Sequence, residues 1–468
     1  MRYDVNKNEY STVDLIIPKG AEELMKRLHS AGHTVYVVGG CVRDTLLGRT
    51  PHDWDLCTSA TPDEMLQIFA DHRVIETGLK HGTITVMCED ESYEITTYRT
   101  DGQYSDGRHP DSVDFVKDVK EDLARRDFTI NAMAYYHDSL FMDFQDPFHG
   151  QSDLTAKLIR TVGNPVDRFT EDGLRILRAL RFASVYDFQI DFATSQAIHV
   201  LRPLLQKISV ERIRVELSKL LAGKAAYRIL SEYADVICEI IPELIPCIGF
   251  HQNNPYHAYN VYDHICHAVE NYWESSEIIN MTLLLHDIGK PSCYTETDGV
   301  GHFHGHGEVS KYIAEQVLDR LKFDNKSKNA ILELIYFHDL RIDPKERAVR
   351  RVLNKMSSPE QFRNLMIVRR ADILAQSEFD QVPRIEKSRT LEKLMNDILE
   401  KDQCFQMKDL AINGMDIIHA FEFDSESLDG KQIGRAKNLC LNAVIDEEVE
   451  NERSALIAYL KEYPEMWR

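Results

Sequence analysis

The stretch VYVVGGCVRDTLLGRTPHDWDL, residues 35–56, combines an apolar run, a double glycine and two aspartates one residue apart. The opening VYVV is rich in β-branched and aromatic residues and predicts a short buried strand. The following CVRDTLLG predicts a helix with Leu46 and Leu47 facing inward and Gly48 at its end. The sequence therefore predicts a strand, a tight turn and a helix in direct succession.

The double glycine, Gly39-Gly40, lies in the predicted turn between this strand and this helix. A turn of this kind directs backbone N–H groups and a helix N-terminus at one point, which favours a phosphate group. Arg43, on the first turn of the predicted helix, can add a charge-assisted contact. An ordinary loop explains a Gly-Gly pair equally well, so the turn alone does not define a site.

Two aspartates follow this helix in HDWDLCTSA. Alternation in this segment predicts a strand with Asp53 and Asp55 on one face and Trp54 and Leu56 on the other. An isolated pair of this kind is most often a solvated strand face. Beside a phosphate-binding turn, however, two such carboxylates can hold two Mg²⁺ ions about 4 Å apart, as nucleotidyl transfer requires. A third acidic residue is common at such sites, and Glu94 in the predicted strand SYEITTYRT is a candidate.

Length and composition limit the class of protein. A chain of 468 residues predicts more than one domain, and 43% hydrophobic residues without a long apolar run predict a soluble protein with no membrane span. The first residues, MRYDVNKNEYSTVDLIIPKG, lack the apolar segment of a secretory signal. Nine scattered cysteines without a CxxC pair predict reduced thiols and a cytoplasmic location. The net charge of −21 argues against a broadly basic surface but leaves room for a local basic groove.

Further motifs follow the first two, VGGCVRDTLLG and DWDLCTSA, in order along the chain. They are RRDFTINAMA, DPFHGQSDL, EDGLRILRALRFA and SVERIRVEL. Taken with the first two, these motifs resemble the class II CCA-adding enzyme and bacterial poly(A) polymerase family of nucleotidyltransferases over roughly residues 15–245. The resemblance implies an α+β fold, with a small mixed-sheet nucleotidyltransferase head followed by all-α neck, body, HD and tail domains. The expected divisions are a catalytic head at residues 1–155, a helical neck and body at 156–245, an HD domain at 250–380 and a tRNA-binding helical tail at 381–468.

The resemblance also implies roles for individual residues. Asp53 and Asp55 would be catalytic and bind Mg²⁺, and the triphosphate would lie on Gly39, Gly40 and Arg43. Contacts to the sugar and phosphates of the nucleotide would come from RRDFTINAMA, through Arg126, Asp127 and Asn131. Without the other motifs, Arg126-Asp127 would be read as a surface ion pair.

The motif EDGLRILRALRFA predicts a helix that selects the nucleobase. Asp172 and Arg175 are three residues apart and would share one helical face. Asp172 can accept from an exocyclic amine while Arg175 donates to the adjacent ring nitrogen, a pattern that cytosine and adenine match and uracil and guanine do not. Glu171, Arg178 and Arg181 flank this pair, and both arginines are nucleotide-binding candidates. An exposed helix with intrahelical ion pairs is the alternative.

A second group of candidate ligands begins after about residue 250. His286-Asp287 ends the apolar helix predicted by MTLLLHDIGKP, and a lone pair of this type is usually a satisfied core pair. Here the order of His264, His286-Asp287, His306 and Asp372 resembles the HD phosphohydrolase superfamily, in which such residues bind a divalent metal. The outer ligands compete with other histidines, namely His257, His267, His302, His304 and His338. Imidazole and carboxylate ligands fit Mn²⁺, Ni²⁺, Co²⁺ or Fe²⁺ better than Mg²⁺ alone, which leaves the metal open.

The resemblance implies a CCA tRNA nucleotidyltransferase that adds C, C and A to the tRNA 3′ end from CTP and ATP, releasing pyrophosphate. A loop expected at residues 98–115 is, in the family, a feature of members that add the terminal A. The HD domain implies phosphatase or cyclic phosphodiesterase activity. The alternatives are an A-adding enzyme or poly(A) polymerase, an HD phosphohydrolase whose head only binds RNA, and a non-catalytic RNA-binding adaptor. The oligomeric state is not predicted.

Overall fold

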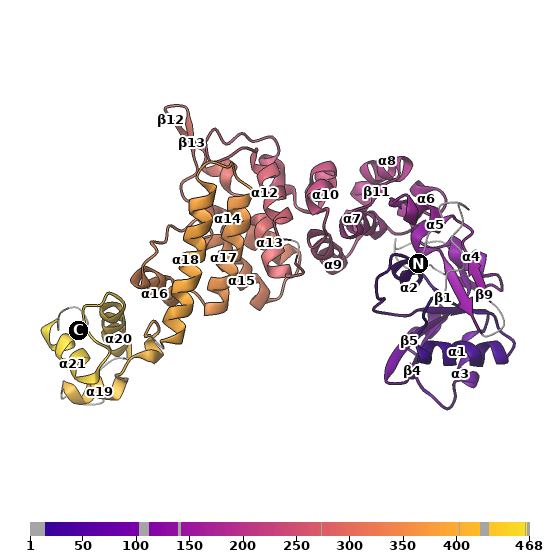
Figure 1. Ribbon diagram of the computed structural model, residues 1–468, viewed down its shortest axis with the longest axis horizontal. Helices are drawn as coiled ribbons and strands as arrows, with labels where there is room; N and C mark the ends of the chain where they lie inside the picture. The colour runs from indigo at the N-terminus through magenta and orange to yellow at the C-terminus, as the bar shows by residue number, and fades with distance from the viewer. Residues whose placement is uncertain are drawn as a thin grey trace. The chain divides into compact units, whose positions relative to one another are not determined.

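The computed structural model describes residues 15–102, 112–138, 142–272, 274–401, 403–421, 430–463 and 465. The centre of the loop expected at residues 98–115 lies outside the described residues. The chain divides into two compact units, Met1–Pro242 and Glu243–Arg468, which are described separately below (Figure 1).

The first unit begins with a seven-stranded mixed sheet. Its strand order is β3-β4-β5-β2-β1-β8-β9. The strands are β1 (Val35–Val38), β2 (Leu56–Thr58), β3 (Arg73–Ile75), β4 (Thr83–Cys88), β5 (Glu91–Thr97), β8 (Ala134–His137) and β9 (Met142–Gln145). β2 and β5 pair in parallel, with Leu56 opposite Ile95, and the other pairs in this sheet are antiparallel.

Short helices complete this head, together with a two-stranded ladder of β6 (Arg99–Asp101) and β7 (Val113–Phe115). The helices are α1 (Lys19–Ser30), α2 (Gly40–Leu46), α3 (Pro62–Ile68), α4 (Val119–Ala124) and α5 (Gly150–Thr155). α2 follows β1 directly, as the sequence predicts. The core between the sheet and these helices includes Val38, Cys57, Tyr98, Leu123 and Ala134.

Helices form the rest of the first unit, and one ladder joins β10 (Leu158–Ile159) to β11 (Gln189–Ile190) in parallel. The helices are α6 (Pro165–Glu171), α7 (Leu174–Tyr186), α8 (Phe192–Leu201), α9 (Val210–Leu221), α10 (Ala226–Glu232) and α11 (Ala234–Ile240), with a 3₁₀ segment, η3 (Arg202–Lys207), before α9. α7 packs along α9 and buries Leu177 and Leu180. This helical part follows a mixed-sheet head, as the resemblance implies.

The second unit is a bundle of helices with one hairpin, β12 (Thr295–Thr297) with β13 (Val300–His302). The bundle helices are α12 (Val261–Glu270), α13 (Glu277–Leu285), α14 (His306–Arg320), α15 (Asn325–Phe337), α16 (Glu346–Lys355), α17 (Pro359–Leu374) and α18 (Gln381–Glu400) (Figure 1). α13 is buried along most of its length because MTLLL has almost no polar side chain. α12, α15 and α17 each contact α13, and α17 also contacts α12 and α15.

Three further helices end the chain: α19 (Gly414–Ala420), α20 (Gly430–Ile445) and α21 (Arg453–Glu462). They enclose a small core of their own that includes Ile417, Cys440 and Leu456. Arg350 of α16 donates to the carbonyl of Val444 at the end of α20, which ties this segment to the bundle. In the described part of the chain, no helix is both long and apolar enough to cross a membrane.

Two local expectations are wrong. Asp53 and Asp55 do not lie on a strand face, because β2 begins only at Leu56 and both aspartates precede it. Asp172 does not share a helix with Arg175, because α6 ends at Glu171 and Asp172 has the extended angles φ −143° and ψ 105°. Gly173 then leads into α7, so Asp172 lies in the corner between two helices rather than on a helical face.

Candidate functional sites

The glycine turn and the paired aspartates lie together at one end of β1. The N–H of Val38 donates to the carbonyl of Asp55 at 2.9 Å, which places the aspartates beside the turn. Gly39 has φ +82°, and a Cβ atom there would lie 2.8 Å from Nη1 of Arg126. Only glycine meets both constraints, since L-residues rarely adopt this φ and the space is filled by a guanidinium group. Gly40 follows as the first residue of α2.

Acidic charge gathers at Asp55. Burial by surrounding protein raises the pKa of Asp55 to about 6, and the charges of Glu94 and Asp53 add to this, while Arg126 opposes it. Asp55 as a whole residue is nevertheless exposed. Carboxylate oxygens are the ligands that Mg²⁺ prefers, and a cation would offset both the loss of water around this carboxylate and the repulsion from Glu94 and Asp53. Within the described residues, Asp53, Asp55 and Glu94 do not form a group of ligand atoms all within 4.8 Å of one another.

A continuous chain of hydrogen bonds joins the glycine turn to α7. Arg43 is buried and donates through Nη1 to Oδ1 of Asn131 at 2.5 Å. Asn131 donates through Nδ2 to Oδ1 of Asp127 at 3.0 Å. Asp127 accepts from Nη2 and Nε of Arg178 at 2.6 and 2.8 Å. Residues from three separate motifs therefore form one connected network.

Charge holds this network in place. Burial alone would raise the pKa of Asp127, but the guanidinium of Arg178 and the amide of Asn131 hold it well below its usual range. Arg43 also lies over the rings of Phe182 and Tyr186, with its guanidinium carbon 5.1 and 5.0 Å from their centres. Asp127 is therefore part of a connected hydrogen-bonded network rather than of a surface ion pair.

The proposed base-selecting pair bonds to protein groups in this structure. Oδ1 of Asp172 accepts from the N–H of Leu174 at 3.0 Å, and Oδ2 accepts from Arg212 at 2.9 Å. Arg175 donates to Glu171 at 2.5 Å and to the carbonyl of Arg168 at 3.1 Å. Both side chains are thus held in defined positions at the start of α7.

Three residues that form ion pairs with residues of the candidate site were not predicted from the sequence. Asp122 is fully buried and accepts from Arg125 at 2.8 Å, with Arg126 at 3.4 Å. Glu216 of α9 is buried and pairs with Arg181 at 3.2 Å. Arg212 holds Asp172. Glu216 and Arg212 pair with residues that are distant in the chain. Asp122 lies at helical spacing from Arg125 and Arg126, but it is one of many acidic residues with such a spacing.

The second unit contains a buried group of four ligand atoms. Nε2 of His264 lies 3.2 Å from Nε2 of His286 and 3.0 Å from Oδ2 of Asp287. Oδ1 of Asp372, from α17, lies 3.1 Å from the same His264 nitrogen. These atoms come from α12, the end of α13 and α17, and all lie within 4.8 Å of one another.

A second group shares Asp287. Oδ1 of Asp287 lies 3.3 Å from His306 and 3.5 Å from His338, and the two imidazole Nε2 atoms are 3.0 Å apart. His306 therefore does not join the first group, and His338, which the sequence left as one competitor among several, is its partner. The sequence does contain a signal for His338, because LLLHD at 283–287 and IYFHD at 335–339 share the same pattern of an apolar run followed by His-Asp.

The four histidines present the same nitrogen to the centre. In each ring Nδ1 lies close to a backbone carbonyl, those of Ala375, Leu283, Phe303 and Ile335. This arrangement places the proton on Nδ1 and leaves the Nε2 lone pair facing inward, as in metal-binding histidines. Both oxygens of Asp287 are buried and lack a hydrogen-bond partner of good geometry among the described residues. The donor set therefore fits divalent metal ions.

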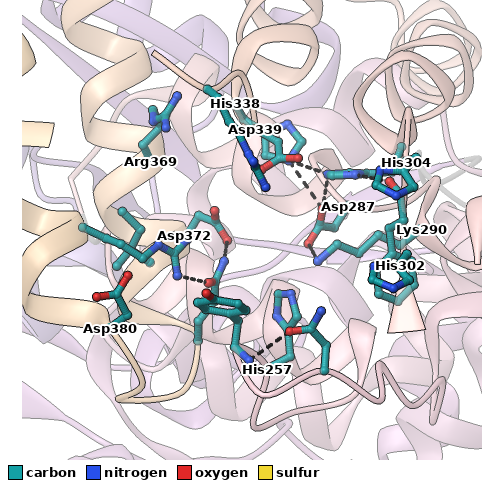
Figure 2. Close-up of a pocket in the computed structure, with 18 of the residues that line it drawn as sticks. His257, Asp287, Lys290, His302, His304, His338, Asp339, Arg369, Asp372 and Asp380 are labelled. Atoms are coloured by element: carbon teal, nitrogen blue, oxygen red, sulfur yellow. Dashed lines mark hydrogen bonds and ion pairs between the residues drawn. The ribbon is translucent and has the colours of Figure 1, made fainter. Parts of the chain in front are cut away.

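The charges of the ligand groups also favour a bound divalent cation. For the protein groups alone, burial lowers the pKa of His286, but the charges of Asp287 and Asp372 outweigh this and raise it to about 10. Two buried carboxylates at one point thus require positive charge beside them, and a divalent cation supplies it. The ammonium of Lys290, also buried, lies 2.7 Å from Oδ2 of Asp287 (Figure 2).

A pocket of about 660 Å³ is lined by four of these ligands, Asp287, His306, His338 and Asp372. Figure 2 shows Arg369 and Asp380 on one side of it and His302 and His304 on the other. His302 ends β13, and neither His302 nor His304 belongs to a ligand group among the described residues. His267 lies beside Tyr259 and Glu270, away from the four-atom group.

Three family profiles match this chain. They are the Poly A polymerase head domain at residues 35–160, the probable RNA and SrmB-binding site of polymerase A at 187–237, and the HD domain at 256–376. The CCA-adding enzyme of Leuconostoc mesenteroides is 32% identical over 446 residues, covering 95% of this chain and 96% of that protein. The CCA-adding enzyme of Enterococcus faecalis is 47% identical over 220 residues, and this chain matches about half the length of that protein and of the other relatives of similar identity.

Solved structures of CCA-adding enzymes also match this chain over most of its length. The Bacillus stearothermophilus CCA-adding enzyme in complex with CTP matches with a TM-score of 0.67 and 29% identity, over 95% of this chain and 97% of that one. The Thermotoga maritima CCA-adding enzyme complexed with tRNA matches with a TM-score of 0.58 at 20% identity, over 95% of this chain and 94% of that one, which shows a shared fold.

Proposed function

Because this chain belongs to the family of CCA-adding enzymes, we propose that it is a tRNA nucleotidyltransferase that adds C, C and A to the tRNA 3′ end from CTP and ATP. The observation that carries the proposal is the hydrogen-bonded chain from Arg43 through Asn131 and Asp127 to Arg178. It connects the turn beside the catalytic carboxylates to the helix that would read the base. The relatives' names favour this activity over A-only addition, polyadenylation or a non-catalytic head.

The residues divide the reaction among them. The backbone of Gly39 and Gly40 and the side chain of Arg43 would hold the triphosphate, while Asp53 and Asp55 would hold Mg²⁺. Bound Mg²⁺ supplies charge neutralisation and a lowered pKa of the attacking hydroxyl. The tRNA 3′ oxygen bonds to the α-phosphorus, the bond to the β-phosphate oxygen breaks, pyrophosphate leaves and the hydroxyl proton passes to solvent.

The network from Arg43 to Arg178 and the residues at the start of α7 would position the nucleotide. Asp127 and Asn131 would orient the sugar and phosphates of the nucleotide, with Arg126 behind the turn. Arg178 and Arg181 would hold the side chains that line the base of the nucleotide site. Asp172 and Arg175 would pair with the Watson–Crick edge of cytosine or adenine. For this pairing the base must replace some of the protein partners that these two side chains have here.

The direct test uses tRNA transcripts that end at the discriminator base, at C or at CC. Each is incubated with Mg²⁺ and with labelled CTP or ATP singly, and the products are resolved by length. CTP should extend only the first two transcripts, and ATP should extend only the third. Extension of all three by ATP would reassign the protein as an A-adding enzyme or a poly(A) polymerase.

A second activity rests on the four inward-facing Nε2 atoms around Asp287. We propose that the HD unit hydrolyses phosphoesters, with His264, His286, Asp287 and Asp372 binding one divalent metal and Asp287, His306 and His338 a second. A bound cation there supplies an activated water and neutralises phosphate charge. Release of phosphate from simple phosphomonoesters with Mg²⁺, Mn²⁺, Co²⁺ or Ni²⁺ tests this, and its persistence in His286→Ala would contradict the assignment.

The location proposed is the cytoplasm. All nine cysteines are free thiols, and eight of them are buried. Unpaired thiols are typical of a reducing compartment, where tRNA and nucleoside triphosphates are also found.

A further inference from the structure

Three side chains with metal-binding atoms meet on the mixed-sheet head. Glu23 lies on α1, His72 in the turn between α3 and β3, and Cys88 at the end of β4. These elements lie side by side, with α1 in contact with both α3 and β4 (Figure 1). One ligand atom from each side chain lies within 4.8 Å of the other two. Among the described residues, this is the one ligand group that contains a cysteine, and it shares no residue with the HD groups.

The distances within this group suit a tetrahedral zinc site. Oε2 of Glu23 lies 3.7 Å from Sγ of Cys88, and Oε1 lies 4.0 Å from Nε2 of His72. Zinc bonds of about 2.0 to 2.3 Å, set at tetrahedral angles, keep neighbouring ligand atoms about 3.4 to 3.6 Å apart. A small movement of the half-exposed Glu23 side chain and of the imidazole therefore closes the group around one ion. Thiolate, imidazole and carboxylate together favour Zn²⁺ over Mg²⁺ or Ca²⁺.

The histidine already presents the nitrogen that a metal needs. Nδ1 of His72 lies 2.9 Å from Oδ1 of Asp71, and Asp71 accepts from Arg27 at 2.8 and 2.9 Å. The carboxylate keeps the proton on Nδ1, so the lone pair of Nε2 is directed at the other two ligand atoms. The ring is 11% exposed and packs edge-on against Phe69, with centres 5.9 Å apart. A carboxylate that orients a histidine in this way is typical of zinc sites.

The carboxylate and the thiol are available to a metal. Cys88 is buried, and its thiol donates to Glu23. Loss of that proton when the ion binds leaves a thiolate as the ligand. Glu23 also pairs with Arg27 at 3.3 Å, but the two side chains are 46% and 34% exposed, and pairs of this kind contribute little to stability. Arg27 keeps its two contacts with Asp71 when Glu23 turns to the ion.

We propose that Glu23, His72 and Cys88 form a zinc site on the head, with Asp71 as the residue that positions the imidazole. The ion replaces the thiol proton of Cys88, which passes to solvent, and its fourth position is open to water beside the half-exposed Glu23. It connects α1 to β4, next to the edge strand β3 of the seven-stranded sheet. Neither proposed activity is needed for this site. No motif predicts it, because its ligands are single residues far apart in the chain.

Titration of the full-length protein with Co²⁺ tests this site. Co²⁺ takes the same ligands as Zn²⁺, and its bond to a thiolate gives an intense charge-transfer absorption band in the near ultraviolet. The HD ligand groups of the described residues contain only imidazole and carboxylate, so Co²⁺ bound there does not give this band. A thiol-free reductant keeps the cysteines reduced without adding sulfur ligands. The wild-type protein should show the band, excess Zn²⁺ should remove it, and excess Mg²⁺ should not.

Variants identify the ligands. Cys88→Ser should abolish the band, and Glu23→Gln and His72→Gln should each raise the Co²⁺ concentration for half of the full signal by at least about tenfold. Glu22→Gln is the matched control, because Glu22 lies on the same turn of α1 and pairs only with Lys26 at 3.7 Å among the described ion pairs. A wild-type protein without the band, or the same band in Cys88→Ser, would overturn the site.

The surface pair keeps the test decisive if the buried Cys88→Ser variant does not fold. The side chains of Glu22 and Glu23 are 43% and 46% exposed, so both glutamine variants should fold, which circular dichroism verifies. Equal Co²⁺ titrations of Glu22→Gln and Glu23→Gln would overturn the site. Asp71→Asn should weaken Co²⁺ binding by about tenfold or more and leave the saturated band unchanged, because the thiolate still binds. Unchanged affinity in Asp71→Asn would contradict its positioning role.

Discussion

At the scale of single residues, acidic charge gathers around Asp55 in the proposed transfer site. The sequence placed Asp53, Asp55 and Glu94 near a glycine turn, and the charge of Glu94 does contribute to the raised pKa of Asp55. The sequence did not reveal Asp122 or Glu216. Asp122 lies at helical spacing from Arg125, but its burial depends on packing, and Glu216 pairs with Arg181, which is distant in the chain. His338 likewise became distinct from the other histidines only when the helices brought it to Asp287.

The raised pKa of Asp55 predicts a pH-dependent response to Mg²⁺. With a pKa of about 6 against an ordinary 3.8, the cation-free folded protein keeps this proton when the unfolded chain has lost it. The stability that this group contributes therefore falls as the pH rises from about 4 to about 6, and a bound cation restores it above that range. Mg²⁺ should raise the melting temperature more at pH 7.5 than at pH 5, as measured by scanning calorimetry.

The HD ligands also respond to pH, so variants must separate the two contributions. Asp55→Asn should remove the part of the Mg²⁺ response that belongs to the transfer site, whereas Asp63→Asn, an exposed change on α3, should keep it. An Asp55→Asn protein with the same pH-dependent Mg²⁺ response as wild type would contradict this role of Asp55.

At the scale of elements, the turn between β1 and α2 was predictable and the corner between α6 and α7 was not. VYVV and CVRDTLLG have strong local preferences that the fold keeps. Alternation predicts a strand that includes Asp53 and Asp55, but alternation cannot locate where strand pairing starts, and β2 begins at Leu56. The corner at Asp172 interrupts a segment with helical periodicity, and Gly173, packed against Leu204, was the one local signal for it.

The close approach at Gly39 predicts a sharp effect of a single methyl group. Gly39→Ala combines an unfavourable φ of +82° with a Cβ atom 2.8 Å from Arg126. Displacement of the turn by about 1 Å should lower kcat/KM for nucleotide addition by about 100-fold. Gly32→Ala is the matched control, because Gly32 has φ +88° with nothing within 4 Å of the added atom. Equal kinetics for the two variants would show that the contact with Arg126 does not matter.

The corner at Asp172 predicts a change in nucleotide selection. Asp172→Ala should raise incorporation of U relative to C on a tRNA ending at the discriminator base by at least about tenfold, because the acceptor for the exocyclic amine is lost. It also removes the cap on Leu174, at a cost of about 1 kcal/mol in stability. Asp172→Asn retains an oxygen for that cap, so altered selection without lost stability would assign the effect to base reading. Asp167→Ala, exposed on α6, should leave selection unchanged.

At the scale of the whole molecule, the two candidate sites lie in different compact units. The fold class, a mixed-sheet head followed by helical parts, followed from the resemblance that the motifs carry. The sharing of Asp287 between two ligand groups did not follow, because it depends on residues in or at the ends of five helices, α12, α13, α14, α15 and α17, meeting at one point.

Separate units predict separable activities. Asp53→Ala should abolish nucleotide addition while leaving phosphoester hydrolysis within about twofold of wild type, and His286→Ala should do the reverse. Addition and hydrolysis are measured on the same preparations, with circular dichroism to verify folding. Loss of both activities in either variant, with the fold intact, would mean that the sites depend on each other.

The most direct measurement of the central claim is sequencing of the tRNA 3′ ends after incubation with Mg²⁺ and all four nucleoside triphosphates in equal concentration. The starting transcript ends at the discriminator base. The account predicts C, then C, then A on nearly every molecule, followed by arrest, and no addition by Asp53→Ala. Uncontrolled A tails, frequent U or G, or no Mg²⁺-dependent extension would contradict it.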